Sequence, residues 1–462
     1  MSEVKLPEGW CYACVGDYLY LKNGFAFKST SYVNASEHTY PVIRISDLNG
    51  THASDRNAVH VSAGESGFEI NNGDLLIAMS GATTGKIGVY LGRTPAYQNQ
   101  RVGNITLRST KYGNAKYRDF LISSLSDTIL KIAYGGAQPN ISGKAIEQIK
   151  ILLPPLAEQQ IIADKLDDLL ARVESIKTRL ENIPEILKKF RQSVLSAAVS
   201  GKLTEEWRCQ NSTSLEDWKY LSLSNIVSNI EAGKNIKCIE VPPKDNEVGI
   251  IKISAVTWGK YDEEESKTLE DDSLFIESRR ICVGDFLISR ANTLELLGNP
   301  VIVHSVTRNL MLSDKVLRLI MPDEDKLWVS IFLRSSVGRK EIESRSTGNQ
   351  LSMRNIGQKS LLAIPLPYPE SDEKREIVKK VEAFLTYAEN IENQSYDVLS
   401  KIKNLTQSIL AKAFRGELTA QWREENPELI SGLNSAEALL EKITAEKLAT
   451  GTVKKRAKKS PH

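Results

Sequence analysis

The sequence predicts an α+β fold in which two similar mixed α/β domains are each followed by a long helix. Three observations carry the prediction: an internal repeat, a heptad stripe in each copy of it, and matching strand and loop signals ahead of each stripe. The chain has 462 residues, enough for about three or four domains of ordinary size. Apolar residues make up 41% of it, which is enough to fill their cores.

The repeat is clearest between residues 190–208, FRQSVLSAAVSGKLTEEWR, and residues 405–423, LTQSILAKAFRGELTAQWR. Nine of the nineteen aligned positions are identical at a constant offset of 215 residues (405 minus 190), whereas chance gives about one. Each segment contains a glycine, Gly201 or Gly416, at the place where a helix with a left-handed C-cap would end. The match predicts a pseudo-two-fold internal repeat.

Apolar residues recur with alternating spacings of three and four, which is the a/d pattern of a coiled coil. The pattern predicts long helices over 158–199 and 373–414, and the economical arrangement is that they pack on each other. Pro184 predicts a kink in the first helix, where Asn182 could cap a restarted helix, and Leu399 holds the corresponding place in the second. The predicted seam residues are Leu166, Leu169, Val173, Ile176, Leu180, Ile183, Leu187, Val381, Phe384, Ile391, Val398, Ile402 and Leu405.

Two further signals recur ahead of the helices. A Gly-Asp turn leads into an apolar strand in INNGDLLIAMSG (70–81) and in ICVGDFLISRAN (281–292). A loop rich in Gly, Gln and Asn leads to a short helix and a proline-terminated strand in GGAQPNISGKAIEQIKILLPPL (135–156) and in STGNQLSMRNIGQKSLLAIPLP (346–367). The expected boundaries are domains at 1–152 and 209–364, helical regions at 153–208 and 365–425, and a C-terminal helix with a basic tail at 426–462.

Composition narrows the class of protein. The net charge is only +2, so a nucleic-acid-binding chain of this kind must gather its basic residues on one surface. Five cysteines without framework spacing, no signal peptide and no stretch approaching the ~20 apolar residues of a membrane span predict a cytoplasmic protein. Cys11 and Cys14 form a C-x-x-C, but no second ligand pair lies nearby to complete a zinc site.

Motifs of catalysis are also missing. The segment SGATTGKIG (80–88) resembles a phosphate loop, but it has one residue too few after Gly81 and carries Ile87 where Ser or Thr should bind magnesium. No adenine-methyltransferase tetrapeptide of the N-P-P-Y type occurs, and the five histidines show no ligand spacing. The acidic segment PDEDK (322–326) is expected to be an exposed turn. We therefore expect no catalytic residue, no metal site and no cofactor bound by this chain.

Two similar domains joined by paired helices suit a two-fold ligand. A protein with two such domains can address two half-sites on B-DNA, because the DNA backbone has the same symmetry. Two alternatives to a protein that only reads DNA remain: a scaffold whose repeats bind only other proteins, and a self-contained enzyme that both methylates and cuts DNA. A test of DNA binding distinguishes the protein-binding scaffold from a DNA-reading protein. The self-contained enzyme would require a cofactor-binding domain, and no segment of the sequence supplies one.

Residues 153–208 resemble the central conserved region of type I restriction–modification specificity subunits, and residues 404–443 resemble their distal conserved region. The similarity is greatest to the enterobacterial K-type (type IA) group, and NGFAFKS (23–29) also recurs in that family. The second copy departs from the family pattern PP-x-x-EQ, since LPYPESDEKREIV (366–378) can be aligned with two inserted residues.

The resemblance implies a non-catalytic subunit with two target recognition domains, each reading one half of a split, asymmetric site on double-stranded DNA. The helices would form an antiparallel coiled coil that sets the spacer and docks two modification subunits. Two restriction subunits would join for cleavage, so the chain would be required for both adenine methylation and restriction. S-adenosylmethionine, ATP and magnesium would belong to these partner subunits.

Base contacts favour Arg, Lys, Asn and Gln, and phosphate contacts favour Lys, Arg and Ser. The two loops rich in Gly, Gln and Asn are the strongest candidates, because they recur at the same place in both copies. The candidate DNA-contacting residues are Lys28, Arg44, Ser80, Lys86, Gln98, Gln100, Arg101, Gln138, Asn140, Lys144, Lys252, Arg290, Asn292, Lys315, Arg345, Asn349, Gln350 and Arg354.

Overall fold

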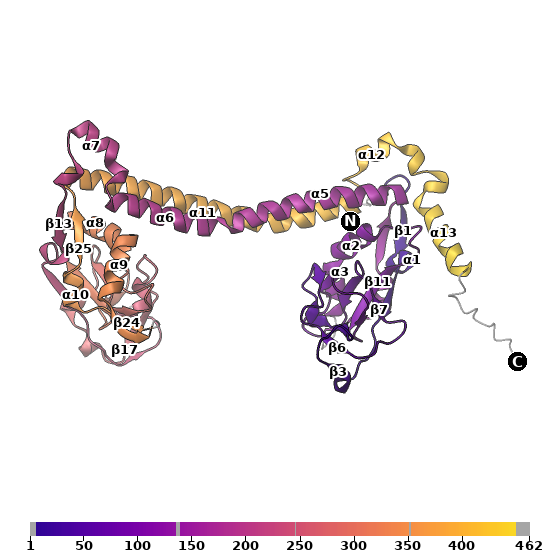
Figure 1. Ribbon diagram of the computed structural model, residues 1–462, viewed down its shortest axis with the longest axis horizontal. Helices are drawn as coiled ribbons and strands as arrows, with labels where there is room; N and C mark the ends of the chain where they lie inside the picture. The colour runs from indigo at the N-terminus through magenta and orange to yellow at the C-terminus, as the bar shows by residue number, and fades with distance from the viewer. Residues whose placement is uncertain (1–5, 135–138, 245, 351–352, 450–462) are drawn as a thin grey trace. The chain divides into compact units, whose positions relative to one another are not determined.

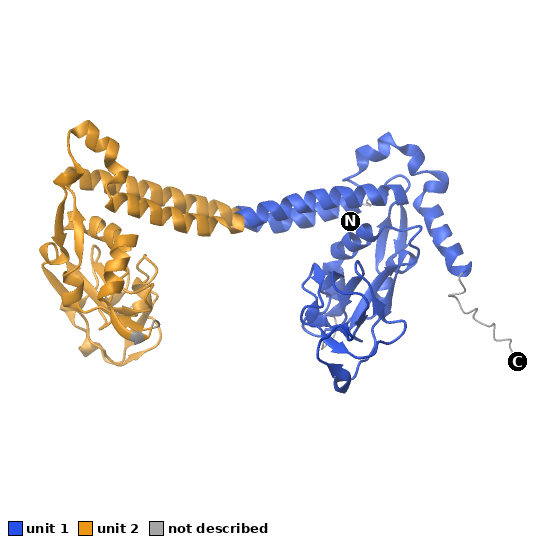
Figure 2. Ribbon diagram, in the orientation of Figure 1, with its two compact units in different colours: residues 1–179, 398–462 blue, residues 180–397 orange. Residues whose placement is uncertain are grey.

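We describe the protein from a computed structural model, for residues 6–134, 139–244, 246–350 and 353–449. The chain divides into two compact units, unit 1 with residues 1–179 and 398–462 and unit 2 with residues 180–397 (Figure 2). Each unit combines one α/β domain with one stretch of paired helices (Figure 1). Within the described residues, no helix is both long and apolar enough to cross a membrane.

The α/β domain of unit 1 contains two five-stranded sheets and a two-stranded one. The first sheet has the order β2 (Leu19–Asn23), β11 (Val102–Leu107), β8 (Leu75–Ala78), β9 (Ile87–Tyr90) and β5 (His52–Ala53). The second has the order β3 (Tyr32–Val33), β6 (Val59–Val61), β4 (Tyr40–Ile43), β10 (Ala96–Gln98) and β7 (Glu69–Ile70). The third pairs β1 (Cys11–Cys14) with β12 (Lys150–Leu153).

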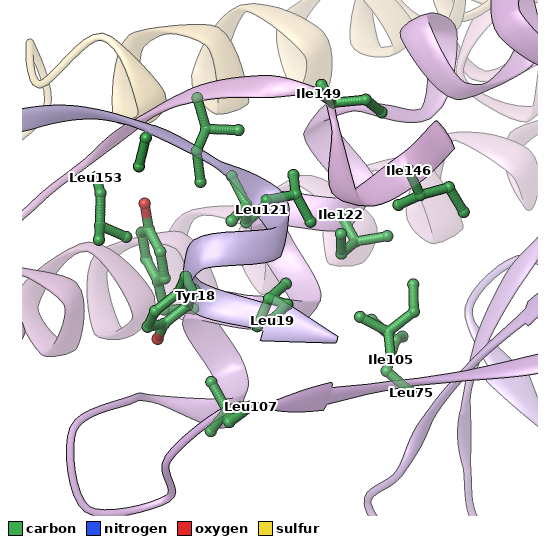
Figure 3. Packing of buried hydrophobic residues seen from close by; sticks show 14 of the residues in the cluster. Tyr18, Leu19, Leu75, Ile105, Leu107, Leu121, Ile122, Ile146, Ile149 and Leu153 are labelled. Carbon is green, nitrogen blue, oxygen red and sulfur yellow. The ribbon is translucent and has the colours of Figure 1, made fainter. Parts of the chain in front are cut away.

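Short helices cover the first sheet of unit 1 and close its core (Figure 3). They are α1 (Val15–Tyr18), α2 (Ala115–Ser124), α3 (Ser126–Ala133) and α4 (Gly143–Glu147). The side chain of Asn114 caps α2 and that of Ser142 caps α4, as their preference for helix N-termini predicts. Tyr18, Leu75 and Leu121 are almost completely buried in this core.

The paired helices of unit 1 belong to the same core as its domain. Helix α5 (Leu156–Glu181) contributes Leu166, and the last part of α11 (Ser371–Phe414) contributes Leu410. Helix α12 (Ala420–Glu425) follows, and α13 (Ala436–Ala449) packs Leu439 into this core. The C-terminal segment predicted as a separate part is therefore integrated into unit 1 as far as Ala449.

The domain of unit 2 repeats the strand order of the first two sheets of unit 1, with four strands in each sheet instead of five. One sheet has the order β14 (Asn229–Ala232), β22 (Val316–Ile320), β18 (Phe286–Ser289) and β20 (Pro300–Ile302). A second has the order β15 (Cys238–Ile239), β17 (Ser266–Leu269), β16 (Val248–Ile251) and β21 (Asn309–Met311), with β16 and β21 parallel as β4 and β10 are. A third has the order β19 (Ala291–Asn292), β24 (Met353–Asn355) and β23 (Thr347–Gln350).

The limits of this second domain differ from the prediction. Strand β25 (Pro365–Tyr368) pairs with β13 (Lys219–Ser222), so the domain extends beyond residue 364. The prediction of an exposed turn at PDEDK was wrong, because Asp323 opens helix α8 (Asp323–Arg334) and Asp325 is buried in an ion pair with Lys374. The remaining helices of the domain are α9 (Ser336–Arg345) and α10 (Gln358–Leu362).

The helices pair antiparallel within each unit. In unit 1, Lys165 of α5 donates to the carbonyl oxygen of Leu418, just past the end of α11. Unit 2 also contains α6 (Ile183–Val199) and α7 (Glu205–Asn211), and there Arg191 of α6 pairs with Glu392 of α11. Lys380, nearer the start of α11, donates to the carbonyl oxygen of Leu203, beyond the end of α6, so the two helices run in opposite directions.

The predicted seam is buried at one of the two positions in each heptad, except at Leu180, and only partly covered at the other position. Leu166, Val173, Leu187, Val381 and Ile402 are buried. Leu169, Leu180, Ile183 and Ile391 are half-buried. Ile176, Phe384, Val398 and Leu405 are exposed to 40–49%. A pair of helices covers only the centre of each apolar stripe, so its flanking positions remain open.

The break predicted at Pro184 is present, because α5 ends at Glu181 and α6 begins at Ile183, whereas α11 continues through Leu399. Asn182 occupies the N-cap position, but its side chain makes no capping hydrogen bond, contrary to the prediction. Gly201 and Gly416 have φ of 74° and 76°, which confirms the predicted left-handed ends.

The five cysteines are free thiols, and their burial predicts different reactivities. Burial, with Glu437 and Asp17, raises the pKa of Cys11 to about 11, whereas Cys209 and Cys282 are exposed. We expect an alkylating reagent at pH 8 to modify Cys209 and Cys282 rapidly and Cys11 only after unfolding, because the thiolate is the reactive form. Timed alkylation followed by peptide mass spectrometry tests this, and equal labelling of Cys11 in the folded protein would contradict it.

Candidate nucleic-acid interface

In unit 1, three strand ends that carry polar residues meet at one edge of the domain. Arg44 directly follows β4, Ser80 lies just beyond β8, and Arg101 lies beyond β10. The backbone N–H of Met79 donates to the carbonyl oxygen of Arg101 at 2.8 Å, and Ser80 forms an isolated bridge with Asn140. The loop that contains Asn140 was predicted to lie at the site, and this bridge places it beside the end of β8.

Unit 2 has the same edge with the same backbone bonds. The N–H of Arg290 donates to the carbonyl oxygen of Lys315 at 2.8 Å, as Met79 does to Arg101. The carbonyl oxygen of Arg290 accepts from Ile356, as that of Met79 accepts from Ile141. Positions 79 and 290 are therefore structurally equivalent, and so are positions 101 and 315.

Two further positions match. Asn355 pairs with Ala291 as Asn140 pairs with Ser80. Lys252 follows β16 as Arg44 follows the corresponding strand β4. Each unit thus has one cation directly after a strand of its parallel pair, Arg44 after β4 or Lys252 after β16. A second cation lies beyond the other strand of the pair, Arg101 beyond β10 or Lys315 beyond β21.

Two adjoining hollows of about 400 Å³ each mark this edge in unit 2. They share Ile253, Asp314 and Lys315, and the cations Arg290 and Lys252 line one hollow each. Glu240 also lines one of them, but it is paired with Lys267, which lowers the pKa of Glu240 by a hydrogen bond.

The side chains of Lys252, Arg290 and Lys315 remain available for a ligand. Lys252 is half-buried, whereas Arg290 and Lys315 are exposed. None of the three has an ion-pair partner among the residues that the structure describes. Unpaired cations beside a hollow suit the phosphates and base edges of a nucleic acid.

Several other predicted contact residues are also accessible. In unit 1, Lys28, Lys86, Gln100, Arg101, Asn140 and Lys144 are exposed, and Ser80 is half-buried. Arg44 is half-buried beside Asp47, with 3.7 Å between Nε and Oδ2. In unit 2, Gln350 is exposed on β23. Gln138 lies outside the described residues, and so does the side chain of Asn349.

Four predicted contacts have internal partners instead. Gln98 is 1% exposed and donates to the carbonyl oxygen of Lys22, which corrects its assignment to the surface. Arg345 pairs with Glu341 on its own helix. The guanidinium of Arg354 donates to Ser346 and so braces the β23–β24 hairpin, and the amide of Asn292 donates to Thr257 at 3.2 Å.

The segment SGATTGKIG forms the turn between β8 and β9. Gly81 and Gly85 adopt φ of 86° and 83° there. A phosphate loop leads into a helix N-terminus, whereas this turn leads into the strand β9. No cluster of three potential metal ligands occurs within the ranges described.

A buried cluster in unit 1 joins the domain to α5 and to α12, the helix that follows α11. Glu158, at the start of α5, accepts hydrogen bonds from the indole of Trp10 at 2.7 Å and from Thr419 at 2.5 Å. Arg423 of α12 forms an ion pair with the same carboxylate at 2.5 Å. Burial raises the pKa of Glu158, and these three donors oppose that shift.

Unit 2 contains the same cluster at equivalent positions. Glu373, at the start of α11, accepts from Trp218 and Thr204 at 2.7 Å each and pairs with Arg208 at 2.5 Å. Glu373 lies 215 residues after Glu158, the offset of the repeat. The two-residue insertion proposed in the second proline motif was therefore wrong.

Sequence reasoning missed these clusters although two of their members were already identified. Thr204 and Arg208 match Thr419 and Arg423 among the identical positions of the repeat. The invariant offset could also have identified the two glutamates, had the motif LPYPESDEKREIV been aligned without a gap. We refer to the residues around Glu158 and Glu373 as the two Glu–Arg clusters.

Comparison with known proteins agrees with this architecture. Residues 7–185 match the family described as type I restriction modification DNA specificity domain. The chain is 37% identical to the type I restriction enzyme EcoKI specificity subunit of Escherichia coli K12, with 100% of both chains covered. It is 34% identical to the StySPI specificity subunit of Salmonella potsdam, again over 100% of both chains.

Solved structures show the same fold. A chain from a type I R-M system superposes with a TM-score of 0.64 at 17% identity, covering 89% of this chain and 99% of that one. The HsdS subunit of Thermoanaerobacter tengcongensis superposes with a TM-score of 0.59 at 16% identity, covering 90% and 99%. From the full-length similarity and the shared fold, we conclude that the chain belongs to the type I restriction–modification specificity subunits of the K-type group.

Proposed function

We propose that this chain is the non-catalytic subunit that determines the DNA sequence recognised by a type I restriction–modification enzyme. The α/β domain of each unit reads one half of a split, asymmetric site on double-stranded DNA. The observation that carries the proposal is the recurrence of one cation-bearing edge in both domains, with Arg44 and Arg101 in unit 1 and Lys252 and Lys315 in unit 2. A recurring edge with different surrounding residues suits two half-sites of different sequence.

The paired helices set the spacer between the half-sites and dock two modification subunits. The open seam positions, among them Ile176, Phe384 and Leu405, support such docking because they leave apolar side chains exposed along the helices. Two restriction subunits complete the enzyme for cleavage. S-adenosylmethionine, ATP and magnesium are bound by these partners rather than by this chain, and the complex acts in the cytoplasm.

Adenine-methylation mapping of host DNA tests this function. The chain is expressed with its cognate modification subunits, and the control host lacks only this chain. We expect a split, asymmetric motif with a fixed spacer to be methylated only when the chain is present. Active modification subunits that methylate no new motif in its presence would contradict the proposal and favour a protein-binding scaffold.

A further inference from the structure

The geometry points to Arg290 as a residue that selects bases in the half-site read by unit 2, while Arg101 and Lys315 bind phosphates irrespective of sequence. The inference rests on the proposed function and deepens it. It concerns two pairs of equivalent positions in the two domains. Positions 79 and 290 form the first pair, where base selection is assigned to Arg290, and positions 101 and 315 form the second pair, where phosphate binding is assigned to both residues.

The backbone at positions 79 and 290 is fixed in the same way. Each N–H donates to the carbonyl oxygen of the residue directly before the neighbouring strand, Arg101 before β11 or Lys315 before β22. Each carbonyl oxygen accepts from an isoleucine of the recurring loop segment, Ile141 or Ile356. Bonds on both sides hold the backbone, so a difference in side chain changes the chemistry at this place without changing the fold. Rigid support of this kind is what a specific contact requires.

The two side chains differ in type and in exposure. Met79 is 7% exposed and packs into the core, so closely over Gly103 that an added Cβ there would lie 2.9 Å from its sulfur. Arg290 is exposed and lines a hollow of about 400 Å³ with Lys315, Met353 and Asn355. In this part of the described chain its guanidinium has no acceptor.

Neighbouring candidates are less suited to read a base. Arg354 is held by Ser346, and the amide of Asn292 is held by Thr257. Among the described residues that line the hollow, Arg290 is the only arginine. A guanidinium offers a planar pair of donors that fits the O6 and N7 atoms of guanine in the major groove, which a methionine cannot do.

Positions 101 and 315 behave differently, because both domains keep an exposed cation there. Two domains that read different bases are expected to share only those contacts that do not depend on the base sequence. Phosphate groups are present in every DNA site, so a shared cation is expected to bind phosphate. The chemistry therefore predicts a guanine in the half-site of unit 2, contacted by Arg290, and no arginine contact from the equivalent position of unit 1.

Methylation mapping of three variants in the complete methyltransferase complex tests the inference. Arg290→Met introduces the residue that unit 1 carries at this position, and Arg290→Lys keeps the charge without the planar pair of donors. Lys315→Ala is the control for a phosphate contact. Relative methylation rates of purified complexes on duplexes with each base at the affected position give the size of the effect.

We expect both Arg290 variants to make one guanine position of a single half-site degenerate, with a roughly 10- to 100-fold loss of discrimination. The other half-site and the spacer should remain as in the wild type, which also shows that the variants are folded. Lys315→Ala should lower methylation at all sites without changing the motif.

Three outcomes would overturn the assignment. If both Arg290 variants methylate the unchanged motif at a uniformly reduced rate, Arg290 is a phosphate contact. The same conclusion follows if Arg290→Met abolishes all methylation while Arg290→Lys keeps the motif unchanged. An unchanged motif with unchanged rates would remove Arg290 from the interface. Failure of the proposed function is distinguishable, because the wild-type chain would then direct no motif at all.

Discussion

Replacement of Glu373 by alanine is expected to lower the free energy of unfolding of unit 2 by about 3–5 kcal/mol. The carboxylate is buried, and its removal leaves the buried guanidinium of Arg208 without its counter-charge and the indole N–H of Trp218 without its acceptor. Glu158→Ala should have a similar effect on unit 1, where Arg423 and Trp10 lose the same partner.

Denaturant unfolding followed by tryptophan fluorescence measures this effect, since Trp10 and Trp218 donate directly to the two carboxylates. The matched control is Asp372→Ala, one residue before Glu373 in the same helix. Asp372 pairs with Arg375, but both side chains are about 77–78% exposed, so the expected cost is only about 0–1 kcal/mol. Equal unfolding midpoints for Glu373→Ala and Asp372→Ala would show that the cluster does not hold the domain on its helices.

Charge reversal at Lys315 is expected to weaken DNA binding by the methyltransferase complex about 100-fold or more, because a carboxylate would face a phosphate. Arg101→Glu should act equally through unit 1, since position 101 is equivalent to position 315. The milder Lys315→Ala should reduce the dependence of log K on log salt concentration by about one unit, as expected for the loss of one phosphate contact.

Fluorescence anisotropy with a duplex carrying the wild-type motif, titrated at several salt concentrations, measures both effects. Lys219→Glu serves as the control, because Lys219 is exposed on β13 and lines neither hollow of the cation-bearing edge of unit 2. Unchanged affinity and salt dependence for Lys315→Glu would exclude this edge from DNA contact. A loss for Lys219→Glu as large as that for Lys315→Glu would indicate a response to net charge rather than to this edge.

The heptad pattern of apolar residues was enough to predict the long helices, and identical residues were enough to predict the repeat. Coiled-coil seams and left-handed glycine ends depend on local spacing, so the pattern of residues alone is enough to place Leu166, Gly201 and Gly416. The identical positions of the repeat likewise predicted two related units. Buried and open seam positions could not be separated, because both belong to the same heptad pattern and only the packed pair of helices distinguishes Val173 from Ile176.

The sequence by itself determined that the chain has two copies of one architecture, each with a domain and a long helix. Only the tertiary structure decided which polar side chains remain available, because that depends on contacts between residues far apart in the chain. Gln98 is held by Lys22, and Asp325 is paired with Lys374 across 49 residues, whereas Arg290 remains exposed beside a hollow. Residue type does not distinguish a structural cation from one that is available for DNA, since the distinction depends on which acceptors the fold brings near it.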